Sequence, residues 1–175
     1  DGGGAIIMTT AERAKGLKNK PAYILGTGEE ITHKDISSMP DFTKTGAIQS
    51  GQRAYAAARL SVSDVDVAAV YDAFTICTLL FLEDLGFCEK GEGGAFVADG
   101  GIAPGGRFPV NTNGGGLSYC HPGMYGLLVL IEAARQIQGV CGPRQVAGAE
   151  IALAHGNGGV LSSQCTVLLG AEATL

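Results

Sequence analysis

Short apolar runs alternate along the chain with longer segments of helical character. Val67 to Val70 is apolar at every position, which is typical of a strand buried on both faces of a parallel sheet. Apolar residues bounded by turn signals predict further strands at 5–9, 21–27, 151–154 and 162–169. Helical spacing and capping residues predict helices at 10–17, 44–60, 75–85 and 123–138.

Capping residues mark several of the expected helix ends. Thr10 is placed to cap the first helix, and Glu12 would lie in its first turn. Gly86 follows the helix expected at 75–85, and Gly139 follows the one expected at 123–138. Glycine commonly ends a helix at such positions. Pro122 is expected in the first turn of the last helix, where its missing N–H has no helical partner to lose.

The order of these elements predicts the fold class. Strands alternate with helices and end in an antiparallel hairpin around a glycine turn at 155–159, while the polar segment 28–42 is expected to run over the surface. This pattern predicts an α/β fold whose five-stranded sheet is mostly parallel, with an antiparallel C-terminal edge and helices on both faces. In such sheets, sites form at the carboxyl ends of strands and at helix N-termini.

Composition and charge exclude several classes of function. The chain has 175 residues, 46% of them hydrophobic, which suits one compact domain with a core. A net charge of −5, with no basic stripe, argues against a nucleic-acid surface. No apolar run is long enough to span a membrane and no secretory signal is visible, so we expect a cytoplasmic protein. The start at Asp1, without a methionine, suggests an excised piece, although processing would look the same.

The cysteines and glycines narrow the candidate chemistry. The five cysteines are widely spaced, lack a CxxC pair and are accompanied by only three histidines, so neither a disulfide framework nor a metal site is expected. We interpret them as reduced thiols, several of them buried. The 28 glycines occur in clusters, which favours tight loops that approach a ligand closely.

The end of the apolar strand 67–70 and the expected hairpin turn carry candidate binding groups. Tyr71 and Asp72 follow the apolar strand and precede a helix, whose N-terminal dipoles favour an anion. The alternative is that Tyr71 is a core aromatic and Asp72 a helix cap. Exposed backbone N–H groups of His155, Gly156 and Asn157 could bind an oxyanion, although any hairpin turn uses such residues.

The loop 111–123 is the densest in reactive side chains. Glycines at Gly114 and Gly115, next to Asn113, would let a substrate approach the backbone. His121, just before a helix, could donate to a developing oxyanion or take part in proton transfer. The alternative is a polar loop whose Asn and Ser side chains satisfy backbone groups.

These loops together resemble the thiolase superfamily. The loop NTNGGGLSYCHPG is similar to the N-x-x-G-G loop of thiolases with its GHP-like step. The segment YDAF stands where thiolases have NEAF or HDCF, and the segment HGNGG stands where they have C-x-G. The resemblance implies that residues 1–20 end an N-terminal half and linker, and that 21–175 form a C-terminal thiolase-like domain. It also implies a nucleophilic cysteine in a preceding half, a homodimer or larger assembly, and coenzyme A as part of the substrate with no tightly bound cofactor.

The departures from the thiolase pattern suggest a particular branch. Ala73 and Ala154 stand at the positions of the acid/base cysteine, and a methyl group cannot move a proton. YDAF with SYCHPG is similar to the lipid-transfer aldolases of bacterial steroid side-chain degradation, which work with an OB-fold partner protein. By this resemblance the protein cleaves a β-hydroxy acyl-CoA in a retro-aldol reaction. Tyr71 and Tyr119 would exchange the protons, in an order left open, and His121 would stabilise the thioester oxyanion.

Two other functions remain as alternatives. The first is a thiolase or acetyl-CoA acetyltransferase that performs Claisen chemistry with an unusual base, His155 or Cys120. The second is a non-catalytic lipid or acyl-CoA carrier, which would bind without turnover and be indifferent to replacement of Tyr71, Tyr119 and His121.

Overall fold

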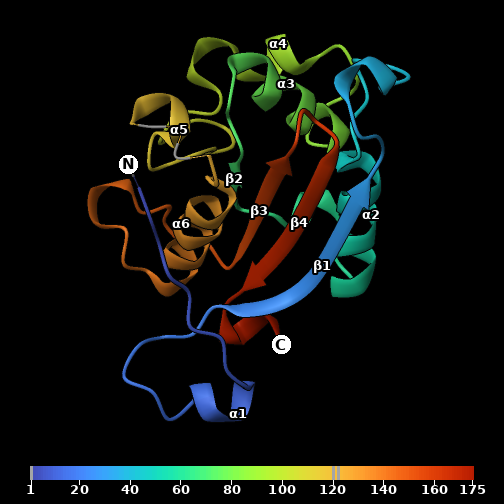
Figure 1. Ribbon diagram of the computed structural model, residues 1–175. Coiled ribbons are helices and arrows are strands. Elements are labelled where there is room, and N and C mark those ends of the chain that lie inside the picture. Colours follow the sequence, from blue (N-terminus) through green and yellow to red (C-terminus); the bar gives the residue numbers. More distant parts are fainter. Residues whose placement is uncertain (1, 120, 122) are drawn as a thin grey trace.

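A twisted sheet with helices on both faces organises the protein (Figure 1). The computed structural model describes residues 2–119, 121 and 123–175, and within them the sheet has four strands in the order β1-β4-β3-β2. β2 runs parallel to β3, whereas β3–β4 and β4–β1 are antiparallel. The strands are β1 (Tyr23–Ile31), β2 (Val67–Val70), β3 (Ile151–Gly158) and β4 (Ser163–Gly170).

Helices fill the segments between the strands and flank the sheet. The α-helices are α1 (Ala11–Ala14), α2 (Ala47–Ala58), α3 (Thr75–Asp84), α4 (Gly93–Val97), α5 (Gly115–Ser118) and α6 (Gly126–Gln138). Short 3₁₀ helices lie at Ile36–Ser38, Val62–Asp64, Ala98–Gly100, Gly142–Arg144 and Glu172–Thr174.

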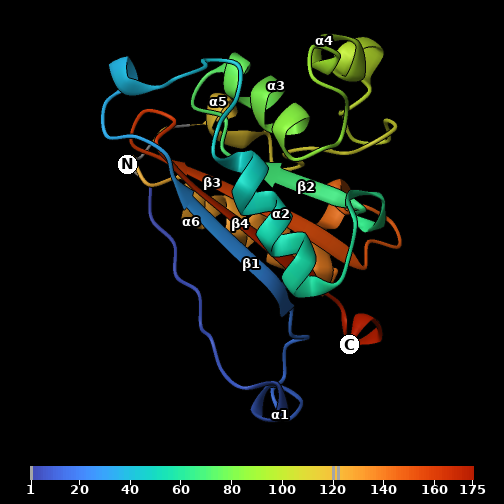
Figure 2. The ribbon, with the colours of Figure 1, turned by 90° about the vertical axis from the view of Figure 1, so that its right-hand side faces the viewer.

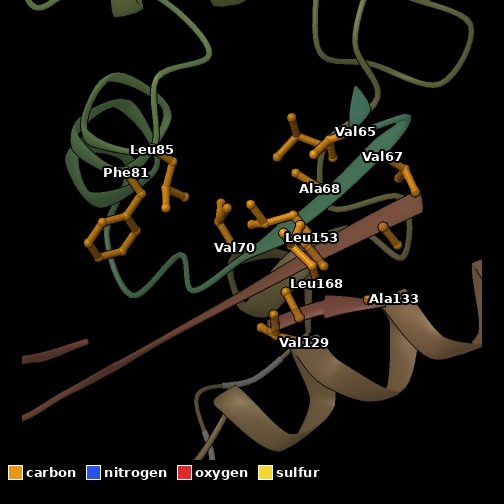
Figure 3. Packing of buried hydrophobic residues seen from close by; sticks show 14 of the residues in the cluster. Val65, Val67, Ala68, Val70, Phe81, Leu85, Val129, Ala133, Leu153 and Leu168 are labelled. Atoms are coloured by element: carbon orange, nitrogen blue, oxygen red, sulfur yellow. The ribbon is translucent and has the colours of Figure 1, made fainter. Parts of the chain in front are cut away.

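The two faces of the sheet carry different helices. α2 and α3 lie on one face, where Ser50 bonds Thr166 of β4 and the ring of Phe81 packs 4.6 Å from that of His155. α6 lies on the other face, where Gly156 Cα comes within 3.7 Å of an ideal Cβ placed on Gly126. The core therefore has two layers, one on each side of the sheet. Figure 3 shows these layers, with Phe81 and Leu85 on one side of the strands and Val129 and Ala133 on the other.

The layered α/β fold predicted from the sequence is confirmed, but the expected five-stranded, mostly parallel sheet is not. Residues 5–9 do not join the sheet. They are extended and exposed, with Ile7 92% accessible, and an ideal Cβ on the preceding Gly4 would lie 2.5 Å from Ile131 Cδ1 of α6. The short apolar run Ala5 to Met8 suits either a strand or an extended segment that passes a helix, so its composition did not distinguish the two.

The other elements differ from expectation mainly at their ends. β1 continues to Ile31, so the first part of the expected surface excursion belongs to the sheet. α1 is shorter than predicted, although Thr10 Oγ1 accepts a hydrogen bond from Arg13 N at 3.4 Å as a cap should. α6 ends at Gln138 and is capped by Gly139, whose φ of 72° is left-handed as expected, but the helix begins at Gly126. Pro122 lies outside the described residues.

The C-terminal hairpin forms as predicted, with its turn displaced. β3 and β4 pair from Ile151–Gly170 to Gly158–Ser163, so the chain reverses at 159–162 instead of at 155–159. His155, Gly156 and Asn157 are consequently strand residues. Because successive side chains of a strand point to opposite faces, this displacement decides which of them can reach a site.

Candidate active site

Tyr71 and His121 meet at the carboxyl end of β2. Tyr71 follows the last residue of that strand, and its backbone N–H donates to His155 O at 2.9 Å, which extends the parallel pairing with β3. The phenol oxygen lies 2.9 Å from Nε2 of His121, and the two rings pack edge-to-face with centroids 5.7 Å apart. Tyr71 is buried and His121 is exposed, so the pair joins the protein interior to its surface.

Tyr125 supports this pair from the start of α6 and was missed by the sequence reasoning. Its ring packs edge-to-face on Tyr71 at 5.7 Å, and its hydroxyl accepts from Asn113 Nδ2 at 3.2 Å. Burial raises the pKa of Tyr125 to about 12, so its phenol stays protonated. The available signal was an aromatic residue directly before a glycine and an apolar helix, which is too common to identify a site residue.

Asp72 accepts backbone hydrogen bonds from a helix beside the site. Its buried carboxylate accepts from the backbone N–H groups of Gly116 at 2.7 Å and Leu117 at 3.3 Å, in the first turn of α5. The alternative interpretation of Asp72 as a helix cap is therefore supported. It caps α5, however, and not α3, the helix that follows it in sequence. Gly115 has a φ of +71°, and a Cβ there would lie 2.0 Å from Asp72 Oδ2. Only glycine fits this position.

Two asparagines fix the first part of the loop 111–123, which we call the glycine loop. Asn111 Oδ1 accepts from Val70 N at 2.7 Å, which ties the start of the loop to β2. Asn113 Oδ1 accepts from Gly115 N at 3.0 Å and its amide reaches Tyr125. The structure therefore brings the expected substrate loop, Asn113 to Gly115, beside the Tyr71–His121 pair.

Tyr119 lies above this loop and is 60% exposed. Its hydroxyl is 3.8 Å from an ideal Cβ on Gly114, whose φ of +95° also requires glycine. Partial burial and the negative charge of Glu132 raise the pKa of Tyr119, so its phenol holds its proton at neutral pH. Cys120, next in the chain, lies outside the described residues.

The residues of the expected oxyanion turn lie on β3 and alternate between the two faces of the sheet. His155 is fully buried on the α2–α3 face, with Nε2 2.8 Å from Gln164 Oε1 and Nδ1 2.9 Å from the Thr166 hydroxyl. The expectation that His155 lies in an exposed turn is therefore wrong, whereas the oxyanion role of its backbone stays a prediction. Asn157 points to the same side and accepts from Gln164 Nε2 at 2.9 Å. Gly156 faces α6, and the role of its backbone stays a prediction.

A pocket adjoins the glycine loop on the α3 side. Its volume is about 460 Å³, and Asp72, Asn111 and Gly114 contribute to its wall. The rest of the lining is largely apolar and comes from α3 and from segments 97–104 and 110–117. Neither Tyr71 nor Tyr119 lines it, so the pocket neighbours the reactive pair without containing it.

The described residues offer neither a metal centre nor a membrane-spanning helix. Among them, no group of three or more His, Cys, Asp or Glu side chains is placed to hold a metal ion. No helix in the described part of the chain has both the length and the apolar character needed to cross a membrane.

Comparison with known proteins places this site in a family. The model of the "Thiolase C-terminal domain-like" family matches residues 28–171. The chain belongs to this family of thiolase C-terminal domains. It is 38% identical over 173 residues to a 17-hydroxy-3-oxo-4-pregnene-20-carboxyl-CoA lyase of Mycobacterium tuberculosis, covering 93% of this chain and 43% of that protein. It is 36% identical over 161 residues to an acetyl-CoA acetyltransferase of Methanothermobacter thermautotrophicus, covering 91% of this chain and 42% of that protein.

Solved structures agree with this placement. A chain of the solved "Ltp2-ChsH2(DUF35) aldolase" superposes with a TM-score of 0.82 at 33% identity, covering 94% of this chain and 43% of that one. This thiolase C-terminal-like chain thus spans less than half the length of the relatives it matches. The relatives' names include an acetyltransferase, a lyase and an aldolase, so family membership leaves the reaction to be argued from the site.

Two alanines give the thiolase-like site its distinctive feature. Ala154 is buried, two residues before Gly156 on β3, and therefore points to the α6 face as Gly156 does. Ala73 follows Asp72 and is half-buried. Neither side chain can exchange a proton, whereas the adjoining Tyr71 and His121 can.

Proposed function

We propose that the protein containing this chain cleaves the Cα–Cβ bond of a β-hydroxy acyl-CoA by a retro-aldol reaction. The observation that carries the proposal is the hydrogen bond between Tyr71 and His121 at the end of β2, where two acid/base groups meet. Alanines at the cysteine positions of the thiolase pattern support it. The lyase and aldolase names among the relatives support the same reaction class.

In this mechanism Tyr71 is the base. Its oxygen takes the proton of the β-hydroxyl group while its own proton passes to Nε2 of His121, 2.9 Å away. The electrons of the O–H bond form the new carbonyl, and those of the Cα–Cβ bond move to the thioester as an enolate. The imidazolium formed at His121 then stabilises the enolate oxygen.

Tyr119 is the acid in the same mechanism. Its raised pKa keeps the phenol protonated, so it can return a proton to the enolate carbon. The products are a carbonyl compound and a shortened acyl-CoA, and the resulting phenolate regains its proton from His121 or from solvent. This assignment is our proposal for the order of the two tyrosines, which their positions in the sequence leave open.

The remaining expectations belong to the same proposal. Coenzyme A is part of the substrate and no tightly bound cofactor takes part. Residues 1–20 end an N-terminal thiolase half and linker, and residues 21–175 form the C-terminal domain of a cytoplasmic homodimer or larger assembly. The name of the solved aldolase, Ltp2-ChsH2(DUF35), joins two components, which supports a partner protein, and the OB-fold of that partner stays a prediction.

Replacing each tyrosine tests the assignment. In the complete protein, Tyr71→Phe and Tyr119→Phe should each lower the turnover of a β-hydroxy acyl-CoA by about 10²–10⁴-fold, because each removes one proton transfer. Tyr55→Phe is the matched control, since Tyr55 donates to Leu85 O beneath α2, away from the site. Unchanged turnover in both site variants would overturn the proposed roles.

A Claisen reaction is the second candidate, favoured by the 36% identity to an acetyl-CoA acetyltransferase. It requires an acid/base group that Ala73 and Ala154 cannot supply. Of the two expected bases, His155 is enclosed in the core and Cys120 lies outside the described residues. A non-catalytic acyl-CoA carrier would bind substrate without turnover. The retro-aldol proposal accounts for the Tyr71–His121 pair, which neither alternative requires.

A further inference from the structure

A buried ion pair lies behind the glycine loop and takes no part in the proposed proton transfers. Glu132 of α6 is 4% exposed, and Arg144 binds both of its oxygens, through Nε at 3.0 Å and Nη2 at 3.0 Å. Burial opposes ionisation of Glu132, but hydrogen bonds from Arg144, Thr112 and Gln136 outweigh it and lower the pKa of this carboxyl. The carboxylate is therefore charged in the folded protein.

Thr112 connects this ion pair to the loop that carries the site. Its buried hydroxyl donates to Glu132 Oε1 at 2.8 Å and accepts from Gln136 Nε2 at 2.8 Å. Thr112 lies between Asn111, which is tied to β2, and Asn113, which bonds Tyr125. The Glu132 carboxylate thus holds the loop at the point where it leaves the sheet for α6.

Hydrogen bonds of Gln136 also fix the segment that carries Arg144. Gln136 Nε2 also donates to Arg144 O at 3.0 Å, and Gln145 Nε2 donates to Gln136 O at 2.9 Å. The 3₁₀ helix that carries Arg144 is therefore locked to α6, and α6 to the loop through Thr112. A rigid support of this kind suits a loop that must present proton-transfer groups in one geometry.

We infer that Glu132 is a positioning residue, which acts through Thr112 to hold the loop that presents Tyr119 and His121 to the substrate. Its charge also acts on the site directly, because Glu132 raises the pKa of Tyr119 while Arg144 opposes it. Neither Glu132 nor Thr112 needs to touch the substrate. The catalytic readouts of this inference rest on the proposed function, whereas the readout on loop geometry does not.

Thr112→Val is the main test, because it removes the hydroxyl while it leaves the ion pair intact. Thr45→Val is a closely matched control. The hydroxyl of Thr45 donates to the buried Asp84 carboxylate at 2.8 Å, and Asp84 is paired with Lys90, far from the loop. We expect Thr112→Val to lower kcat by roughly 10- to 100-fold with little change in KM, as a small displacement of catalytic groups does. Thr112→Ser should restore kcat, and Thr45→Val should leave it unchanged.

The pH profile separates positioning from a purely structural role. Glu132→Gln removes a charge that raises the pKa of Tyr119, so the fall of kcat at high pH should move to lower pH. Thr112→Val keeps that charge and should leave this limb in place. Equal kcat losses in Thr112→Val and Thr45→Val, without rescue by Thr112→Ser, would show that only general stability is at stake and would overturn the inference.

Hydrogen exchange keeps the inference testable if the proposed reaction fails. The amides of Gly116 and Leu117, bonded to Asp72, report the order of the loop. Their exchange should accelerate in Thr112→Val and not in Thr45→Val, whether or not any substrate is cleaved. Unchanged exchange at both amides would contradict the positioning role. Faster exchange in a protein that cleaves no β-hydroxy acyl-CoA would preserve it and refute only the proposed function.

Discussion

At the scale of single residues, a chain of buried polar groups fixes the state of His155. Gln164 directs its amide nitrogen to Asn157 Oδ1 and Leu161 O, so its oxygen accepts from His155 Nε2. Nδ1 is left to accept from the Thr166 hydroxyl. His155 is thus a neutral donor–acceptor within the core, and burial lowers its pKa to about 4.

This environment leads to a pH-dependent stability. The pKa of His155 lies below its unfolded value of about 6.5, so the unfolded chain binds the proton more readily. The contribution of His155 to the free energy of unfolding should therefore be fully present above pH 6.5. It should be lost as the pH drops towards 4, by on the order of 3 kcal/mol. Urea denaturation at several pH values measures this, and His155→Gln should flatten the curve between these limits. A control variant, His33→Gln, should retain it; an equally steep curve in His155→Gln would refute the assignment.

Residue types and the thiolase resemblance singled out candidate side chains, but the contacts that distant residues make could not be predicted. Tyr71 and His121 stood out as acid/base groups at a strand end and before a helix, and the structure joins them by a hydrogen bond. His155 was expected in an exposed turn, yet the turn lies at 159–162 and His155 is in the core. Tyr125 gave no distinctive local signal, because its role depends on packing against Tyr71.

At the scale of elements, the packing of α2 on β1 explains why only the first part of β1 was predicted. Residues 26–30 read Gly-Thr-Gly-Glu-Glu, which lacks the apolar alternation of a strand. Helix α2 covers this edge strand so closely that a Cβ on Gly26 would lie 2.3 Å from Ala54 O, and one on Gly28 2.1 Å from Ser50 O (Figure 2). The glycines that hide the strand from sequence analysis are the ones that its packing requires.

The close approach gives a stability prediction for Gly28. Gly28→Ala should lower the free energy of unfolding by about 1–3 kcal/mol, because β1 and α2 must separate to admit the methyl group. Chemical denaturation measures the loss. Gly94→Ala in α4 is the control, since a Cβ there meets no atom within 4 Å and alanine favours a helix. A Gly28→Ala protein as stable as its parent would mean that α2 does not lie this close to β1.

At the scale of the whole molecule, the site lies where the parallel strand pair, the glycine loop and the start of α6 converge (Figure 1). Large apolar side chains near it in sequence are exposed, among them Phe74, Leu117 and Met124. Such exposure around reactive groups is typical of a surface that meets a substrate or another protein part. It agrees with a chain that spans 43% of the length of its lyase relative.

Alternation of strands and helices was enough to predict the layers of the fold, but not the order of its strands. The apolar run from Val67 identified a buried strand, and the glycine turn identified the hairpin. That β1 pairs with β4 depends on contacts between residues far apart in sequence, such as Tyr23 with Gly170, which local patterns do not encode. The expectation of a mostly parallel sheet came from strand–helix alternation, and among the described strands only β2 and β3 pair in parallel.

The most direct test of the central claim compares two substrates. The complete protein, with its expected partner, is given a β-hydroxy acyl-CoA in one reaction and a 3-ketoacyl-CoA with free CoA in another, and mass spectrometry identifies the products. We expect a carbonyl compound and a shortened acyl-CoA from the first reaction alone, because Tyr71, His121 and Tyr119 can move the required protons while Ala73 and Ala154 cannot. Thiolysis in the second reaction alone would contradict the retro-aldol account and point to another base.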